Sequence, residues 1–154
     1  MRRVFATAFL GMACVGLLAG PALAANQQTN GQGLTNQANT LGFNAKADLR
    51  GHLTYVAHDG SGLQIKCHGY DSYRFALTAA GFPRTRVTAT CVDQNGTTVY
   101  IKVYFIDKGE PGVDDKVLFY ASYDATYRHN AELDPNAFVD AGVISDGNVQ
   151  IHFS

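Results

Sequence analysis

Four carboxylates lie close together in one short segment of this sequence. Asp107, Glu110, Asp114 and Asp115 surround a Gly-Glu-Pro-Gly turn. Hard oxygen ligands on a tight loop are what Ca²⁺ requires, so the segment is a candidate calcium site. The spacing does not match an EF-hand loop, however, and the same residues fit a solvated hairpin turn whose acids face water. The sequence leaves both interpretations open.

Tyrosine is the second residue type that suggests a function. The chain has eight tyrosines and no tryptophan, and five of them cluster on adjoining predicted strands and a long loop: Tyr100, Tyr104, Tyr120, Tyr123 and Tyr127. Strand alternation places the first three opposite the aliphatic face. A half-exposed aromatic surface of this kind binds sugars, peptides or proteins. The structural alternative is that these rings fill a second core layer.

Catalytic groups are harder to find. No Gly-x-Ser-x-Gly motif and no HExxH-like spacing occur. His52 and His152 would be neighbours only if their strands pair, and hydrogen-bonded sheet histidines are the ordinary interpretation. Residues 124–140 form a long polar connection without helical periodicity, and such loops often bind ligands or act as lids. We therefore expect a protein that is not an enzyme, with a small secreted hydrolase whose site lies under this loop as the alternative.

The N-terminus predicts export. Arg2 and Arg3 precede an apolar run that ends at Leu18, and Ala22-Leu23-Ala24 provides a signal-peptidase pattern. We expect a signal peptide over residues 1–24 and no membrane span, because the apolar run is short and no second one follows. The uncharged, Gln/Asn-rich residues 25–40 predict a flexible tether, and residues 41–154 a single domain. The protein is therefore expected to be secreted.

Two cysteines remain after the leader, at Cys67 and Cys91. An even pair in a chain bound for an oxidising compartment favours a disulfide over free thiols or a metal site. Alternation in residues 63–67 and 87–91 places each cysteine on the apolar face of its strand. Both sulfur atoms should therefore point into the core and form one disulfide.

Net charge limits the partners. Without the leader, 10 Lys and Arg stand against 13 Asp and Glu. An acidic chain is a poor match for nucleic acid or an anionic membrane. The basic residues are also scattered along the sequence, with only Arg84 and Arg86 close together, so no positive stripe is apparent.

From residue 41 onward, short runs alternate apolar and polar residues and are separated by turn residues. Asn95-Gly96 supplies the positive φ angles of a tight hairpin between two such runs. Val99, Ile101, Val103 and Phe105 share one face of the second run, and Val117, Phe119 and Ala121 are the inward positions of a further run over residues 117–123. The pattern predicts an all-β fold, an antiparallel β-sandwich or barrel of eight to nine strands with no convincing helix. Two of the strands are expected over residues 137–144 and 148–153.

Three motifs together resemble a known family. Gly51-His52-Leu53-Thr54-Tyr55, the segment from Asp107 to Asp115, and the segment from Gly147 to His152 look like the post-COAP domain family of secreted bacterial, mostly actinobacterial, proteins. The resemblance covers nearly the whole domain and implies export and an all-β fold. It assigns no catalytic residues.

Taken together, the sequence predicts a secreted, non-catalytic β-domain that acts as an extracellular or cell-surface binding or structural module. Its expected partner is a glycan, a cell-wall polymer or a protein. Calcium is the one cofactor that the residues suggest.

Overall fold

The structure is a computed structural model and describes residues 27–35, 37–109 and 114–152. Within these residues the chain forms nine strands and two short 3-10 turns. The strands are β1 (Gln28–Thr35), β2 (Thr40–Lys46), β3 (Gly51–Val56), β4 (Gln64–His68), β5 (Ser72–Leu77), β6 (Pro83–Asp93), β7 (Thr98–Ile106), β8 (Lys116–Ser122) and β9 (Phe138–His152). Every pairing is antiparallel. The predicted all-β fold is confirmed.

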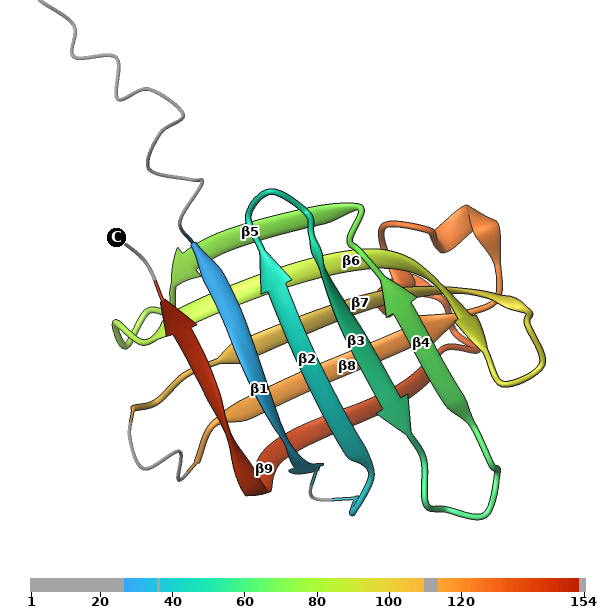
Figure 1. Cartoon of the computed structure of the whole chain (residues 1–154), viewed down its shortest axis with the longest axis horizontal. Coiled ribbons are helices and arrows are strands. Elements are labelled where there is room, and N and C mark those ends of the chain that lie inside the picture. The colour runs from blue at the N-terminus through green and yellow to red at the C-terminus, as the bar shows by residue number, and fades with distance from the viewer. Residues whose placement is uncertain (1–26, 36, 110–113, 153–154) are drawn as a thin grey trace, which may run out of the picture.

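Eight of these strands close into a barrel. Their order around the ring is β4-β3-β2-β1-β9-β8-β7-β6, and β6 pairs back to β4. β5 is an additional strand that pairs only with β6. Of the two architectures that the sequence allowed, the barrel is the one that forms. Figure 1 shows β1 to β4 crossing in front of β6, β7 and β8, so the barrel is flattened into two walls.

One long strand connects the two walls. β9 pairs with β8 through residues 138–143 and with β1 through residues 144–152. The sequence pattern instead predicted two separate strands over 137–144 and 148–153. Residues 145–147 are exposed and interrupt the apolar alternation without ending the strand, because pairing with β1 continues through them with a register shift between Asp146 and Ile144.

β1 is the largest departure from expectation. It lies within residues 25–40, which we predicted to be a flexible tether, and that prediction is wrong over Gln28–Thr35. Gln and Asn alternate with Thr and Gly here, so the strand lacks an apolar period. A Cβ on Gly31 would stand 2.2 Å from the Asn148 carbonyl oxygen, and one on Gly33 would stand 2.5 Å from that of Asp146. These glycines allow β1 to pack closely against β9.

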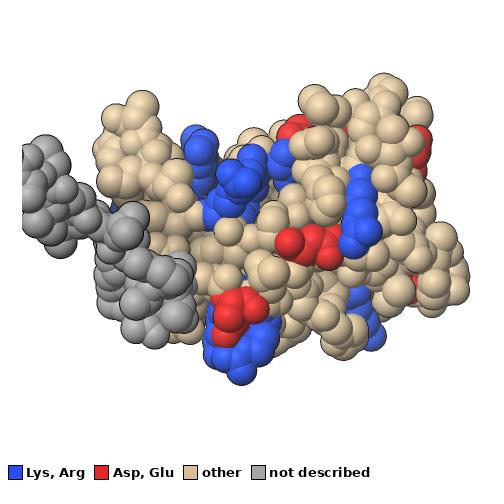
Figure 2. Space-filling view, turned by 90° about the horizontal axis from the view of Figure 1, so that it is seen from above, with Lys and Arg blue, Asp and Glu red and all other residues tan. Residues whose placement is uncertain are grey.

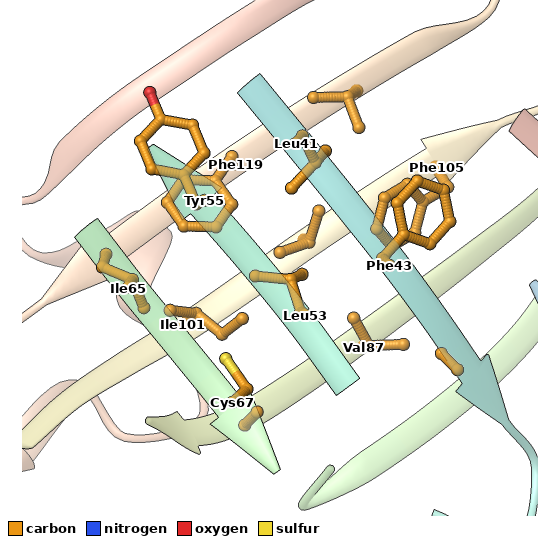
Figure 3. Close-up of a cluster of buried hydrophobic side chains, with 14 of the residues drawn as sticks. Leu41, Phe43, Leu53, Tyr55, Ile65, Cys67, Val87, Ile101, Phe105 and Phe119 are labelled. Atoms are coloured by element: carbon orange, nitrogen blue, oxygen red, sulfur yellow. The ribbon is translucent and has the colours of Figure 1, made fainter. Parts of the chain in front are cut away.

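A single hydrophobic core fills the barrel. Aromatic rings from the front wall stack on rings from the back wall, Phe43 on Phe105 with centroids 3.9 Å apart and Tyr55 on Phe119 at 4.4 Å. Figure 3 shows these pairs with the aliphatic side chains around them. The inward positions predicted from the sequence on β7 and β8 are confirmed as fully or almost fully buried: Val99, Ile101, Val103, Phe105, Val117, Phe119 and Ala121.

The predicted disulfide is confirmed and lies where the barrel closes. The ladder between β4 and β6 has two residue pairs, Ile65 with Asp93 and Lys66 with Val92. Cys67 and Cys91 come next in the same register, with Cα atoms 4.4 Å apart, and are joined by a disulfide. The covalent bond therefore extends a short hydrogen-bonded ladder.

A buried carboxylate joins the two walls at another place. Asp140 of β9 is fully buried. Its Oδ2 accepts hydrogen bonds from the Thr35 hydroxyl at 2.8 Å, the Asn39 amide at 2.9 Å and the Tyr55 hydroxyl at 2.8 Å. Its Oδ1 is buried and has no hydrogen-bond partner among the described residues. Burial, and then the hydrogen bond to Asp140, raise the pKa of Tyr55, so this hydroxyl stays protonated and continues to donate.

Removing the disulfide should destabilise the barrel substantially. The crosslink spans a sequence separation of 24, for which the chain-entropy model gives about 3.5 kcal/mol. We expect the Cys67→Ala/Cys91→Ala variant to lose about that much free energy of unfolding in urea titrations. The native protein in reductant is the control, because it lacks the bond and keeps both side chains. A double variant as stable as the oxidised protein would contradict this account.

Tyr55→Phe should also destabilise the fold, because it removes one of the three donors to a buried carboxylate and keeps the ring. A hydrogen bond to a charged group contributes about 1.5 to 3 kcal/mol, and we expect a loss in that range from urea unfolding. Tyr73→Phe is the matched control, since among residues 27–35, 37–109 and 114–152 its hydroxyl bonds only to the neutral Thr29 hydroxyl, at 3.1 Å. Equal losses in the two variants would show that Asp140 does not act as a charged acceptor.

Candidate functional site

Of the four predicted calcium ligands, the structure describes Asp107, Asp114 and Asp115. Asp107 accepts hydrogen bonds from the Gly109 amide at 2.8 Å and the Ile151 amide at 3.0 Å. Asp115 is fully buried and accepts the Lys108 and Val149 amides, each at 2.8 Å. Each of these two carboxylates therefore bonds to one backbone amide of the β7–β8 connection and to one of β9.

The other two acids add little to a metal site. Asp114 is exposed, with a positive φ of 74°, and Glu110 lies outside the described residues. Among residues 27–35, 37–109 and 114–152, no group of three or more His, Cys, Asp or Glu is arranged to hold a metal ion. Calcium binding stays a prediction, and the carboxylates of Asp107 and Asp115 already have backbone partners.

His52 and His152 lie on strands that do not pair with each other. His52 on β3 pairs across the ladder with His68 on β4, and both are exposed. His152 pairs with Gln28 on β1, so it is not a neighbour of His52.

The predicted tyrosines do gather on one outer wall. Three of them are half-buried on the outside of β7 and β8: Tyr100, Tyr104 and Tyr120. They surround Lys102, because Tyr100 and Tyr104 lie on either side of it along β7 and Tyr120 pairs directly with it from β8. The ammonium of Lys102 lies 5.9 Å from the centre of the Tyr104 ring. Tyr127 is half-buried in the connection to β9, whereas Tyr123 is 52% exposed and donates a hydrogen bond to Asp93 at 3.1 Å.

Strand register brings three arginines together beside these tyrosines. Arg74 on β5 pairs directly with Arg86 on β6, which pairs with Tyr104 on β7. Arg84 lies two residues from Arg86, and alternation places it on the same outer face. The next row across the same strands is Ser72, Thr88 and Lys102. A polar surface rich in cations therefore covers β5, β6 and β7.

The arginines lack compensating charges. No carboxylate of the described residues lies within 4.0 Å of the guanidinium groups of Arg74, Arg84 or Arg86. The Nε of Arg86 is buried and has no hydrogen-bond partner in the same part of the chain. Like charges directly opposite one another destabilise a strand pair, so an anion between them would relieve repulsion and supply hydrogen-bond acceptors.

This surface contains two adjoining pockets. One, of about 400 Å³, is lined by Arg74, Phe75, Ala76, Arg84, Arg86 and Tyr104. The other, of about 210 Å³, is lined by Asp71, Ser72, Arg74, Arg86, Thr88, Lys102, His129 and Asn130. Because Arg74 and Arg86 line both, the two pockets adjoin, and we name them together the basic groove. Figure 2 shows Lys and Arg side chains gathered on the side of the molecule seen from above, where β5 lies in Figure 1.

The long loop forms one wall of the basic groove. Its two 3-10 turns span Ala125–Tyr127 and Ala131–Leu133. Asp124 caps the first by accepting the Thr126 amide at 2.8 Å, a hydrogen bond that lowers the pKa of the Asp124 carboxyl. The fully buried Ala131 anchors the second. His129 and Asn130 of this loop line the smaller pocket, and residues 138–140 at the end of the predicted connection belong to β9; a site under the loop stays a prediction.

A buried ion pair holds the loop down. Lys102 is 3% exposed, forms a salt bridge with Glu132, and donates to the Asn130 side-chain oxygen at 3.3 Å. Arg128 of the same loop pairs with Asp71, with Nε and Oδ2 3.5 Å apart. Both contacts connect the loop to the wall formed by β5, β6 and β7, so the loop and sheet position the groove together.

These groups are better suited to binding than to nucleophilic catalysis. The Ser72 and Thr88 hydroxyls lie 2.8 Å apart and share a hydrogen bond. Within the described residues His129 makes no hydrogen bond to Ser72, so the pair lacks the contact that activates a serine. The groove instead offers guanidinium groups, hydroxyls, an amide and an aromatic ring.

Sequence reasoning missed the basic groove. It judged the cations to be scattered, and that interpretation is wrong for Arg74, Arg84 and Arg86. Arg84 and Arg86 were visible as neighbours, but Arg74 reaches them only through the β5–β6 hairpin. Alternation within both strands was the available signal, because Arg74 and Arg86 stand equally far from Ala80, the midpoint of the β5–β6 hairpin.

Lys102→Met should loosen the loop, because it leaves the Glu132 carboxylate without its buried partner. We expect faster amide hydrogen exchange across residues 124–134, with β6 and β7 unchanged. The variant Lys102→Met/Glu132→Leu should recover much of the protection, since it removes the unpaired charge as well. Lys116→Met, at an exposed position on β8, is the control. Unchanged exchange in Lys102→Met would show that this ion pair does not hold the loop.

No helix in the described part of the chain is long and apolar enough to cross a membrane. Comparison with known proteins found no matching family, no matching curated protein and no matching solved structure. The resemblance to the post-COAP domain family therefore stays a prediction, and the site itself must carry the functional argument.

Proposed function

We propose that this protein is a secreted, non-catalytic binding module and that the basic groove is where it binds an anionic ligand. The observation that carries the proposal is the direct pairing of Arg74 with Arg86, beside Arg84, with no carboxylate among the described residues to neutralise them. Planar guanidinium groups recognise carboxylate, sulfate and phosphate oxygens through paired hydrogen bonds.

The surroundings of the arginines support this function. The chain as a whole is acidic, so a local cluster of unpaired cations is not a consequence of general basicity. The half-buried Tyr104 ring lies next to the cluster and adds apolar contact area. The loop of residues 124–137 is held by Lys102 and Arg128, which gives a preformed wall and lowers the entropy cost of binding.

Arg74→Gln/Arg86→Gln should abolish most of the binding. We expect the purified protein to bind at least one of a set of anionic polymers, namely polygalacturonate, heparin and poly-L-glutamate, in fluorescence anisotropy at low salt. Each charge-assisted hydrogen bond contributes about 1.5 to 3 kcal/mol, so the double variant should bind at least about tenfold more weakly. Affinity should also fall as salt is added.

Lys66→Gln is the matched control, because Lys66 is an exposed cation on β4 that lines neither pocket of the groove. It should leave the affinity unchanged. Loss of binding in this control equal to that in the arginine variant would point to general charge rather than the groove. Absence of binding to all three polymers would refute the proposed function, and shortened polymer chains after incubation would favour the hydrolase alternative.

A further inference from the structure

We infer that the ligand of the basic groove is an acidic saccharide chain, with a sugar ring in the smaller pocket and the anionic group of the chain on the arginines of the larger one. This inference rests on the proposed function, since it names the class of anion that the groove binds. The argument comes from the difference between the two pockets.

The smaller pocket is built for hydroxyl groups. Besides Arg74, Arg86 and Lys102, which is paired with Glu132, it brings together the carboxylate of Asp71, the hydroxyls of Ser72 and Thr88, the His129 ring and the Asn130 amide. These side chains include both donors and acceptors, and a sugar hydroxyl is itself both a donor and an acceptor. A ligand that carries only anionic groups would use the donors and leave the acceptors without partners.

Asp71 gives this pocket a selective element. Its Oδ2 accepts a hydrogen bond from the Thr90 hydroxyl at 2.8 Å and lies 3.5 Å from Arg128, whereas Oδ1 has no hydrogen-bond partner among the described residues. A carboxylate in this position repels a second anion and accepts hydrogen bonds from neutral hydroxyl groups. Among the described residues Asp71 is the one carboxylate that lines either pocket, so the smaller pocket offers hydroxyl groups an acceptor that the larger one lacks.

The larger pocket shares Arg74 and Arg86 with the smaller one but has no carboxylate, serine or threonine in the lining that the structure describes. Its charged residues are Arg74, Arg84 and Arg86, and the aromatic rings of Phe75 and Tyr104 complete the lining. The arginines suit a carboxylate or sulfate, and a half-buried tyrosine offers an apolar face and a hydroxyl to a sugar ring. A ligand with hydroxyls and anionic groups on neighbouring units matches both pockets at once.

The two pockets are arranged along one strand. Arg84, Arg86 and Thr88 occupy alternate positions on the outer face of β6, so their Cα atoms follow one another at about 7 Å intervals. Arg86 lines both pockets and Arg84 only the larger one, which places the charged end of the groove toward Pro83 and the hydroxyl-lined end toward Thr88. An extended polymer lying along β6 would contact both ends.

The test compares polymers that separate charge from hydroxyl content. Oligogalacturonate and a heparin oligosaccharide carry both, poly-L-glutamate of matched charge carries no hydroxyls, and methyl-esterified oligogalacturonate carries no charge. We expect at least one acidic oligosaccharide to bind at least about tenfold more tightly than the other two classes in calorimetry. Binding of only one acidic sugar would support the inference and identify the anionic group.

Variants separate the roles of the two pockets. Ser72→Ala/His129→Ala should weaken oligosaccharide binding by about tenfold and leave binding to poly-L-glutamate unchanged, whereas Arg74→Gln/Arg86→Gln should weaken both. Thr54→Val on the outer face of β3 is the control for loss of a hydroxyl and should bind like the native protein.

Two outcomes would overturn the inference in different ways. Equal affinity for poly-L-glutamate and the acidic oligosaccharides would exclude a saccharide-specific site and leave the proposed anion-binding function intact. Absence of binding to every polymer, or equal binding of the methyl-esterified oligosaccharide, would remove the proposed function together with the inference.

Discussion

Closure of the sheet between β4 and β6 is the constraint on which the rest of the structure depends. Only two residue pairs form the ladder there, and the Cys67–Cys91 disulfide extends it covalently. A sheet closed in this way loses most of its unpaired edges. It also forces the strands into two crossing walls, so each wall presents one face to the core and one to the outside.

The position of the basic groove follows from this closure. β6 pairs with β4 only through Val92 and Asp93, and its first half pairs on the same side with β5. The additional strand β5 thus widens the back wall beyond the barrel and brings Arg74 next to Arg86. The loop before β9 then covers the adjoining part of the same wall through Lys102 and Glu132. Barrel closure, strand addition and loop docking together produce one groove from four separate chain segments.

Local alternation was sufficient to predict much of this fold. It identified the all-β class, the inward faces of β7 and β8, and the disulfide, because each depends on residues near one another in sequence. It failed for β1, because the inward positions of this strand are not apolar: they are Thr29, Gly31, Gly33 and Thr35. β1 instead forms through backbone pairing and through hydrogen bonds of its threonines to Asp140 and Thr85. The site was missed for a related reason: its arginines are ordinary surface residues until strand register places them together.

The arrangement of the arginines is itself an argument for function. Two cations at directly opposed positions destabilise a strand pair, and replacing either with a neutral residue would relieve the repulsion. The same face contains well-neutralised charges, with Lys102 paired to Glu132 and Arg128 to Asp71. A local violation of an otherwise consistent pattern is typical of a binding site, where a ligand supplies the missing charge. The proposed anion would offset the energetic cost of the unpaired arginines in the free protein.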